Sequence, residues 1–168
     1  MTAMLPENDE DAFALLRAGD IPRESERQRW LIESLWSESS VGLIGGLPKC
    51  LKSWIALDMA VSVATLTACL GRFEVPRGGP ALAYLAEDSL AALRERLEAL
   101  AALRGLDIAD LDLHVIAARS MRLDLERDQV RLLKTARALA PRLLLLDPLV
   151  RIHRLDENSS AEVSRFLA

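Results

Sequence analysis

Short apolar runs alternate along the chain with longer stretches of helical length. The apolar runs, each long enough for a strand, lie at residues 41–46, 81–86, 113–117 and 143–146. The helical stretches between them lie at residues 52–70, 89–104 and 124–139. The order strand, helix, strand, helix, strand, helix, strand predicts an α/β fold, in which a mainly parallel sheet is flanked by helices and joined by right-handed crossovers.

The spacing of apolar residues within each element predicts how that element is covered. The run at 143–146 contains only leucine, and an unbroken apolar strand is typical of a parallel sheet with helices on both faces. The helix at 52–70 is apolar on most sides, so we expect it to be largely buried. One apolar face of the helix at 89–104 is formed by Leu90, Leu93, Leu97 and Leu100. The border of the buried stripe at 124–139 is marked by Leu125, Val130, Leu133 and Ala136 or Arg137.

The pattern divides the chain into a helical covering segment at residues 1–36 and a core at residues 37–168. Asn8 and the three acids after it predict a helix start, because a capping side chain and early carboxylates satisfy the free amides and the positive dipole end. Gly19 would end that helix. The apolar members of the covering stretch at 22–36 are Trp30, Leu31, Leu35 and Trp36. At the other end Ser159 and Glu162 have capping-box spacing, and we expect the chain to continue beyond this helix start.

Composition narrows the classes of function. Of the 168 residues, 51% are hydrophobic and 27% are charged, which is typical of one globular domain. The net charge of −4 argues against nucleic-acid binding through bulk electrostatics. A local basic cluster of Arg151, His153 and Arg154 has two interpretations: an ordinary solvated loop, or a contact with DNA or a neighbouring subunit.

Cys50, Cys69, His114 and the amino-terminal sequence bear on metal binding and on cellular location. Cys50 and Cys69 are too few for a disulfide framework and lack a C-x-x-C partner, so zinc is not indicated. We interpret His114 as a packed residue rather than a metal ligand. The amino terminus is acidic, unlike a signal peptide, and the apolar stretch at 55–70 is shorter than the ~20 residues of a membrane span. We therefore expect a cytoplasmic protein with no membrane partner.

The sequence GGLPKCLKS, at residues 45–53, lies between a predicted strand and a predicted helix. Its Gly46, Lys52 and Ser53 have the spacing of G-x-x-x-x-G-K-[ST], in which backbone amides and the lysine contact phosphates and the hydroxyl binds Mg²⁺. Leu51 replaces the second glycine at a position that favours positive φ, where a side chain costs about 1–2 kcal/mol. The alternative is an ordinary strand-to-helix turn.

Carboxylates end two of the predicted strands. Asp147 follows the run at 143–146, at the sheet edge where α/β proteins bind ligands; it would hold Mg²⁺ through water or be a plain turn acid before Pro148. Glu87 has two interpretations: a general base for the water that attacks a γ-phosphate, or a surface carboxylate with no catalytic role. For Asp88 and Ser89 we prefer the role of N-cap.

Four segments together carry a resemblance to a known family: GLIGGLPKCLKSW, ALAYLAEDSLAALRERLEAL, LDLHVIAARS and PRLLLLDPLVRIHRLDENSSAEV. From about Trp30 to its last residue, the chain resembles a RecA-like P-loop ATPase of the RepA helicase type. Such proteins are often described as AAA family ATPases. The specific feature is the order: phosphate loop, strand with Glu87, strand, strand with Asp147, and then the segment at 156–160.

The resemblance implies a RecA-like core that forms a homo-oligomeric ring, binds ATP between subunits and couples hydrolysis to movement on DNA. Single-stranded DNA is then an expected partner, and ATP with Mg²⁺ the expected cofactor. By matching position Lys52 would contact phosphates, Ser53 and Asp147 would bind Mg²⁺, and Glu87 would be the catalytic carboxylate. The remaining nucleotide-binding residues implied are Gly46, Leu47, Pro48, Lys49, Cys50, Leu51 and Trp54.

Departures from the family pattern leave other functions open. Leu51 and Leu66 stand where relatives commonly have glycine, and relatives carry further strands with a γ-phosphate sensor, DNA-contacting loops and an arginine finger. An arginine offered by a neighbouring subunit accelerates ATP hydrolysis by about 10³–10⁵. A chain that lacks this arginine would bind nucleotide without hydrolysing it, so the alternative function is a non-hydrolysing nucleotide-binding or oligomerisation module. A P-loop kinase for a small molecule is a third alternative.

Overall fold

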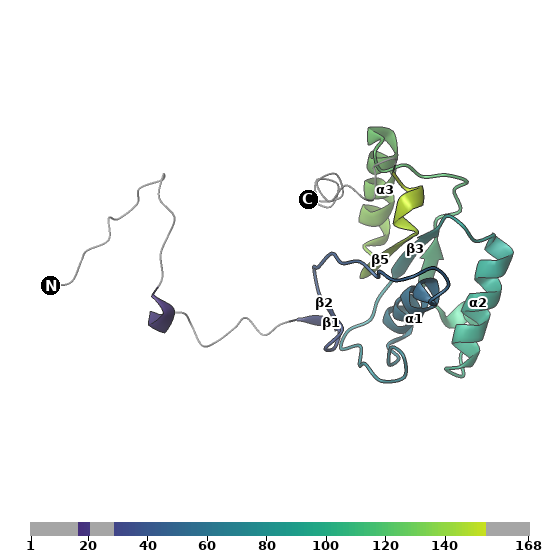
Figure 1. The fold of residues 1–168 in the computed structure, drawn as a ribbon. Coiled ribbons are helices and arrows are strands. Elements are labelled where there is room, and N and C mark those ends of the chain that lie inside the picture. The colour runs from purple at the N-terminus through teal and green to yellow at the C-terminus, as the bar shows by residue number, and fades with distance from the viewer. Residues whose placement is uncertain (1–16, 21–28, 154–168) are drawn as a thin grey trace, which may run out of the picture.

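The computed structural model describes residues 17–20 and 29–153 (Figure 1). Its strands are β1 (Trp30–Ile32), β2 (Trp36–Ser37), β3 (Ala81–Leu85), β4 (Leu113–Val115) and β5 (Leu143–Asp147). Its helices are α1 (Lys52–Thr65), α2 (Leu90–Ala102) and α3 (Glu126–Leu139), with 3-10 turns η1 (Ala18–Asp20), η2 (Ile108–Asp110) and η3 (Leu149–Arg151). The helix start expected at Asn8, the residue Arg154, the segment at 156–160 and the Ser159 capping box lie outside the described residues.

A parallel three-stranded sheet in the order β4-β3-β5 forms the centre of the molecule. The predicted α/β fold, with a parallel sheet flanked by helices, is confirmed. Side chains alternate across the sheet: Leu85 and Leu145 pack with α1 and α2, whereas Tyr84 and Leu146 belong to the cluster on the α3 side. The register pairs Leu85 with Asp147, so β3 and β5 end at the same edge.

The face covered by α1 and α2 holds most of the core. All residues of α1 from Ala56 to Val63 are buried, which confirms the prediction of a largely buried helix. In α2 the buried leucines Leu93, Leu97 and Leu100 pack on Leu57 and Val61 of α1. Leu90 was expected on this face but is 61% exposed, because it lies in the first turn of α2 and takes no part in this cluster.

The α3 face is covered more thinly, and one prediction about it is wrong. Val130 and Leu133 of the expected buried stripe are 42% and 54% exposed, because α3 meets the sheet through Leu132 on a different side. The leucine run of β5 is covered on both faces, with Leu145 in the α1 and α2 cluster and Leu146 in the α3-side cluster, but the cover on the α3 side is incomplete, since Leu144 is 38% exposed. A thin covering layer therefore leaves apolar side chains of both elements in contact with solvent.

The run at 41–46, predicted as a buried strand, forms no strand. An apolar run becomes a strand only where a neighbour pairs its amides, and within residues 29–153 it has no such partner. The segment instead lies against Trp36, whose ring is 2.6 Å from where a Cβ on Gly42 would stand, while Ile44 packs on the cluster that contains Leu31. Val41 is 81% exposed.

The described residues of the covering segment at 1–36 form the 3-10 turn η1 and, at residues 29–36, the strand β1, which pairs antiparallel with β2. Its Leu31 and Ile32 are buried against Met59 and Val63 of α1, whereas Leu35 remains 37% exposed. Over the described ranges 17–20 and 29–153, no helix combines the length and the hydropathy that crossing a bilayer requires.

Candidate functional site

The start of α1 lies at the carboxyl edge of the sheet. At the end of α1, the carbonyl of Val63 accepts a hydrogen bond of 3.1 Å from the amide of Gly79, just before β3 begins. At its start, Trp54 packs against the same buried cluster as Leu85 and Leu145, which lie near the carboxyl ends of β3 and β5. The helix therefore runs antiparallel to the strands and brings the loop before it to the edge where Asp147 ends β5.

The loop before α1 folds around the ammonium group of Lys52. Its Nζ donates to the carbonyl oxygens of Gly46 at 2.9 Å and Leu47 at 2.8 Å, and lies 3.7 Å from the Sγ of Cys50. A Cβ at Gly46 would stand 2.8 Å from that same sulfur, which explains why glycine suits position 46. The predicted nucleotide-binding residues Leu47, Pro48, Lys49, Cys50 and Leu51 are all exposed around this lysine.

Backbone geometry at Leu51 follows the prediction. Leu51 is the N-cap of α1 and has a φ of 64°, in the left-handed region that favours glycine, and Lys49 has a φ of 63°. No side chain caps α1, and among the described residues the first helix amide with an acceptor is that of Ile55, bonded to Leu51 O at 3.0 Å. Amides at the start of α1, including those of Ser53 and Trp54, are thus left for another acceptor.

The two predicted carboxylates lie at neighbouring strand ends. The amide of Ala86 donates to the backbone carbonyl of Asp147 at 2.8 Å, so Glu87, the next residue, is close to that end of β5. The Glu87 side chain is 59% exposed and its Oε1 lies 3.4 Å from the Nε of Arg151, which follows β5. The fold brings Lys52, Ser53, Glu87 and Asp147 to one edge of the sheet.

Other candidate residues are placed differently from expectation. His153 is 5% exposed, so the basic cluster is not a solvated loop as a whole, and Arg151 contacts Glu87. His114, expected to be packed, has a half-exposed side chain 3.0 Å from Asp112, because it points to the thinly covered α3 face from strand β4. Ser89, not Asp88, caps α2 by accepting from the amide of Ala92 at 3.1 Å.

Sequence reasoning missed two arginines that connect elements. Arg96 donates to Asp88 at 2.7 Å, and Arg104 donates to Asp58 at 2.5 Å. Arg96 lies in α2 and Arg104 lies just after it. The helical periodicity of this stretch predicts that its polar residues face solvent. No local motif marks either one, because each partner comes from another part of the chain.

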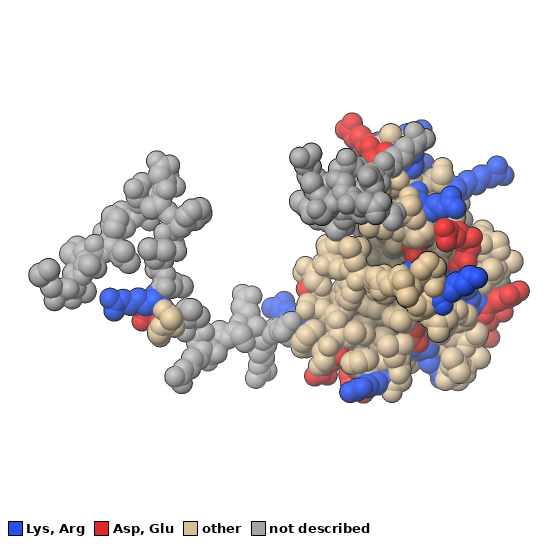
Figure 2. Space-filling model, in the orientation of Figure 1, with Lys and Arg blue, Asp and Glu red and all other residues tan. Residues whose placement is uncertain are grey.

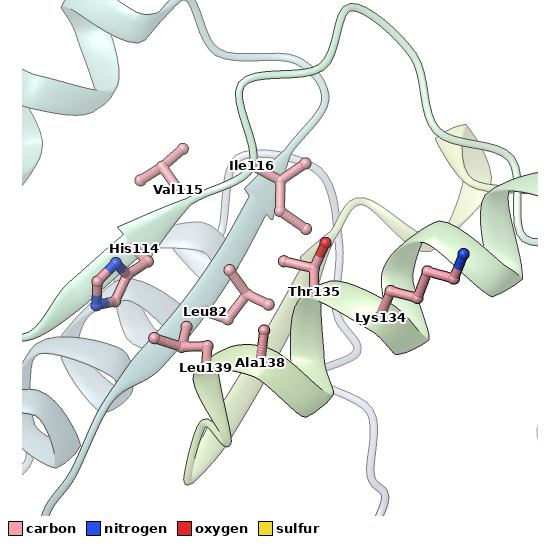
Figure 3. Close-up of a pocket in the computed structure, with 8 residues that line it drawn as sticks. All are labelled: Leu82, His114, Val115, Ile116, Lys134, Thr135, Ala138 and Leu139. Carbon is pink, nitrogen blue, oxygen red and sulfur yellow. The ribbon is translucent and has the colours of Figure 1, made fainter.

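The open groove shown in Figure 3 lies away from this edge. It is formed between the sheet and α3 on the face opposite α1, and its lining residues are Leu82, His114, Val115, Ile116, Lys134, Thr135, Ala138 and Leu139. Its lining is mostly apolar and lacks the loop, the hydroxyl and the carboxylates described above. The candidate functional residues therefore lie at the carboxyl edge of the sheet and not in the groove.

Comparison with known proteins adds the family to this geometry. A sequence model described as AAA domain matches residues 7–168. The chain belongs to the AAA domain family. Membership indicates nucleotide binding and ATPase activity, in agreement with the phosphate-loop sequence. No curated protein and no solved structure matches the chain.

The donor set of this AAA domain fits magnesium better than a metal held by protein alone. In the part of the chain that the structure describes, no three His, Cys, Asp or Glu side chains gather as a metal-binding group. Mg²⁺ is commonly held by one or two protein ligands together with phosphates and water. A hydroxyl at Ser53 and a carboxylate at Asp147, on neighbouring elements of one edge, suit that requirement.

Proposed function

We propose that this chain binds ATP with Mg²⁺ and hydrolyses it as the motor domain of a RepA-type DNA helicase or replication ATPase. The observation that carries the proposal is the loop closed around Lys52 at the sheet edge that also holds Glu87 and Asp147. Phosphoryl transfer depends mainly on positioning and charge stabilisation, and this edge provides a cation, a hydroxyl and two carboxylates.

Each residue has a role within this proposal. Lys52 exchanges its two neutral carbonyl acceptors, Gly46 O and Leu47 O, for phosphate oxygens, which are negatively charged and therefore attract the ammonium group more strongly. The free amides at the start of α1 and of the loop bind the same phosphates. Ser53 and Asp147 hold Mg²⁺, which neutralises phosphate charge when it is bound. Glu87 orients the attacking water once its carboxylate leaves Arg151.

The exposed apolar surface beside the loop supports assembly into a homo-oligomer. The large apolar residues exposed on residues 41–51 are Val41, Leu43, Leu47 and Leu51. Figure 2 shows a broad uncharged area over the segment between β2 and α1, with acidic and basic side chains interspersed around it. A neighbouring subunit would bury this area, and single-stranded DNA would then bind the assembled ring.

Equilibrium titration with a fluorescent ATP analogue and Mg²⁺ tests the assignment. We expect Lys52→Ala to weaken binding by at least about tenfold, or ~1.4 kcal/mol. Lys134→Ala, on the opposite face in α3, is the matched control and should leave affinity unchanged. Equal affinity of Lys52→Ala and the native chain would overturn the proposal.

A second candidate function is a nucleotide-binding or oligomerisation module that does not hydrolyse ATP. Two observations favour it: the left-handed conformation at Leu51 and the contact of Arg151 with Glu87. Steady-state ATP turnover separates the two functions. Robust turnover, stimulated by single-stranded DNA, would eliminate the module; tight binding with no turnover would eliminate the motor.

A further inference from the structure

We propose that Arg96 is a positioning residue that joins the first turn of α1 to the end of β3, and so sets Ser53 relative to Glu87. The inference rests on the proposed function. Arg96 lies in α2, and its guanidinium makes two contacts with other elements: Nη1 donates to the Asp88 carboxylate at 2.7 Å, and Cζ lies 5.6 Å from the centre of the Trp54 ring.

The Trp54 contact reaches the phosphate loop. Trp54 directly follows Ser53 in the first turn of α1, and it packs against the cluster between α1, α2 and the sheet that contains Leu97. Arg96 covers this ring as a cation on an aromatic face. Because the ring is packed in this cluster and covered by Arg96, a shift of the Trp54 backbone would pull the ring away from both, so Arg96 restrains the turn that presents the Ser53 hydroxyl.

The contact of Arg96 with Asp88 lies next to Glu87, the candidate catalytic residue. Ser89 provides the cap of α2, so the Asp88 side chain is released from capping and turns to Arg96. The two side chains are only 16% and 29% exposed, and a partly shielded ion pair is stronger than a surface one. Glu87 lies between Ala86, whose amide is bonded to Asp147 of β5, and the paired Asp88, so the ion pair of Asp88 restrains the backbone of Glu87 on its carboxyl side.

The chemistry of arginine suits both contacts at once. A planar guanidinium can donate in its plane to a carboxylate while its face or edge lies over a ring, whereas a lysine ammonium is a compact point charge. Arg94 in the same helix provides the contrast: it pairs with Glu98 four residues on, and both side chains are largely exposed at 66% and 46%. Among the residues that the structure describes, Arg94 links α2 to no other element, so it is the matched control.

The experiment uses the full chain labelled with 5-fluorotryptophan, which places one ¹⁹F signal at each of Trp30, Trp36 and Trp54, with Trp54→Phe to assign the third. Arg96→Met, Arg96→Lys and Arg94→Met are compared for affinity to Mg²⁺ with a non-hydrolysable ATP analogue and to ADP without metal. Unchanged signals of Trp30 and Trp36 report an intact fold in each variant.

We expect Arg96→Met to weaken binding of the Mg²⁺ triphosphate about tenfold while ADP binding changes less than about twofold, because Ser53 and Glu87 face the metal and the outer phosphate. The nucleotide-induced shift of the Trp54 signal should disappear, Arg96→Lys should recover part of both effects, and Arg94→Met should resemble the native chain.

Two results separate the inference from the proposed function. If the native chain binds and Arg96→Met binds as tightly as Arg94→Met, even with a displaced Trp54 signal, then Arg96 has only a structural role and the inference fails alone. If the native chain binds neither nucleotide, the proposed function fails and takes the inference with it.

Discussion

The two ends of α1 carry the same residue types in opposite settings. Each end has a leucine in the left-handed region, Leu51 with a φ of 64° and Leu66 with a φ of 57°. Each end also has a cysteine nearby, exposed at Cys50 and buried at Cys69. At the amino end the surroundings are solvent and a loop folded on a lysine; at the carboxyl end they are a dense polar network.

The network at the carboxyl end satisfies its polar groups within the protein. Arg104 donates to Asp58 at 2.5 Å, to Ser62 at 2.9 Å and to Thr67 at 2.9 Å, and the other oxygen of Asp58 accepts from the amide of Leu70 at 2.6 Å. The amino end leaves backbone amides without such partners. The comparison indicates that one end of α1 stabilises the fold and the other retains unsatisfied donors for a ligand.

The largest expected effect comes from breaking the carboxyl end. Arg104→Met removes the partner of Asp58, and since the two side chains are only 10% and 12% exposed, an unpaired buried charge remains. We expect the free energy of unfolding to fall by about 3–5 kcal/mol in a urea titration. Arg94→Met, on a surface pair, should change it by less than about 0.5 kcal/mol. Similar losses in the two variants would contradict the contrast.

The next effect is expected at the amino end. Leu51→Gly removes the strain of a left-handed leucine, and little packing is lost because that side chain is 64% exposed. We expect nucleotide affinity to rise by up to about tenfold, or ~1.4 kcal/mol, in the fluorescent titration. Equal affinity of the two proteins would show that the loop accommodates leucine without cost.

A smaller effect is expected from the matching change at the other end. Leu66→Gly relieves the same kind of strain, but it also loses contact with Gly78, where a Cβ would stand 2.7 Å from the Leu66 side chain. We expect the free energy of unfolding to rise by no more than about 1 kcal/mol, with nucleotide affinity unchanged. A gain in affinity equal to that of Leu51→Gly would mean that the two ends are not independent.

At neutral pH the smallest effect on stability is expected from ionisation of the cysteines, because the Cys69 thiol loses its proton only in alkaline solution. Burial, followed by the nearby Asp58 carboxylate, raises the pKa of the Cys69 thiol from 9.0 to about 12. The folded state therefore favours the protonated thiol, and its contribution to stability is complete below pH 9 and is lost as the pH rises from 9 towards 12. Cys69→Ala should flatten this alkaline decline in a pH series of urea titrations.

Thiol labelling gives an independent measurement of the same contrast. At pH 8 a thiol reagent should modify Cys50 in the folded chain and reach Cys69 only after unfolding. Bound nucleotide should slow the reaction of Cys50, whose sulfur lies beside Lys52. Rapid modification of Cys69 in the folded protein would contradict the burial described for the carboxyl end.

Much of the fold could be predicted because its signals are local. Helical period marked α1, α2 and α3, apolar runs marked β3, β4 and β5, and the spacing of Gly46, Lys52 and Ser53 marked the loop. The left-handed φ at Leu51 was also predictable, since its position in the motif is one that glycine normally occupies. The expected roles of these residues in binding and catalysis stay predictions.

The remaining features depend on partners that are distant in the chain. Asp58 in α1 and Arg104 just after α2 are 46 positions apart, and no local pattern around either residue indicates that they meet. The exposure of Leu133 and Leu144 depends on how closely α3 approaches the sheet, and the run at 41–46 lacks a pairing partner among the described residues. This ion pair and these exposed fractions depend on which elements pack against each other. The sequence of a single segment does not contain that information.

The sequence by itself determined the order of α1, β3, α2, β4, α3 and β5 and the residues at the ends of β3 and β5, because hydrophobic periodicity and turn residues act over a few positions. Only the tertiary structure decided that Arg96 faces both Trp54 and Asp88, and that the two ends of α1 differ. The physical reason is that burial and ion pairing depend on distances between elements, which packing alone establishes.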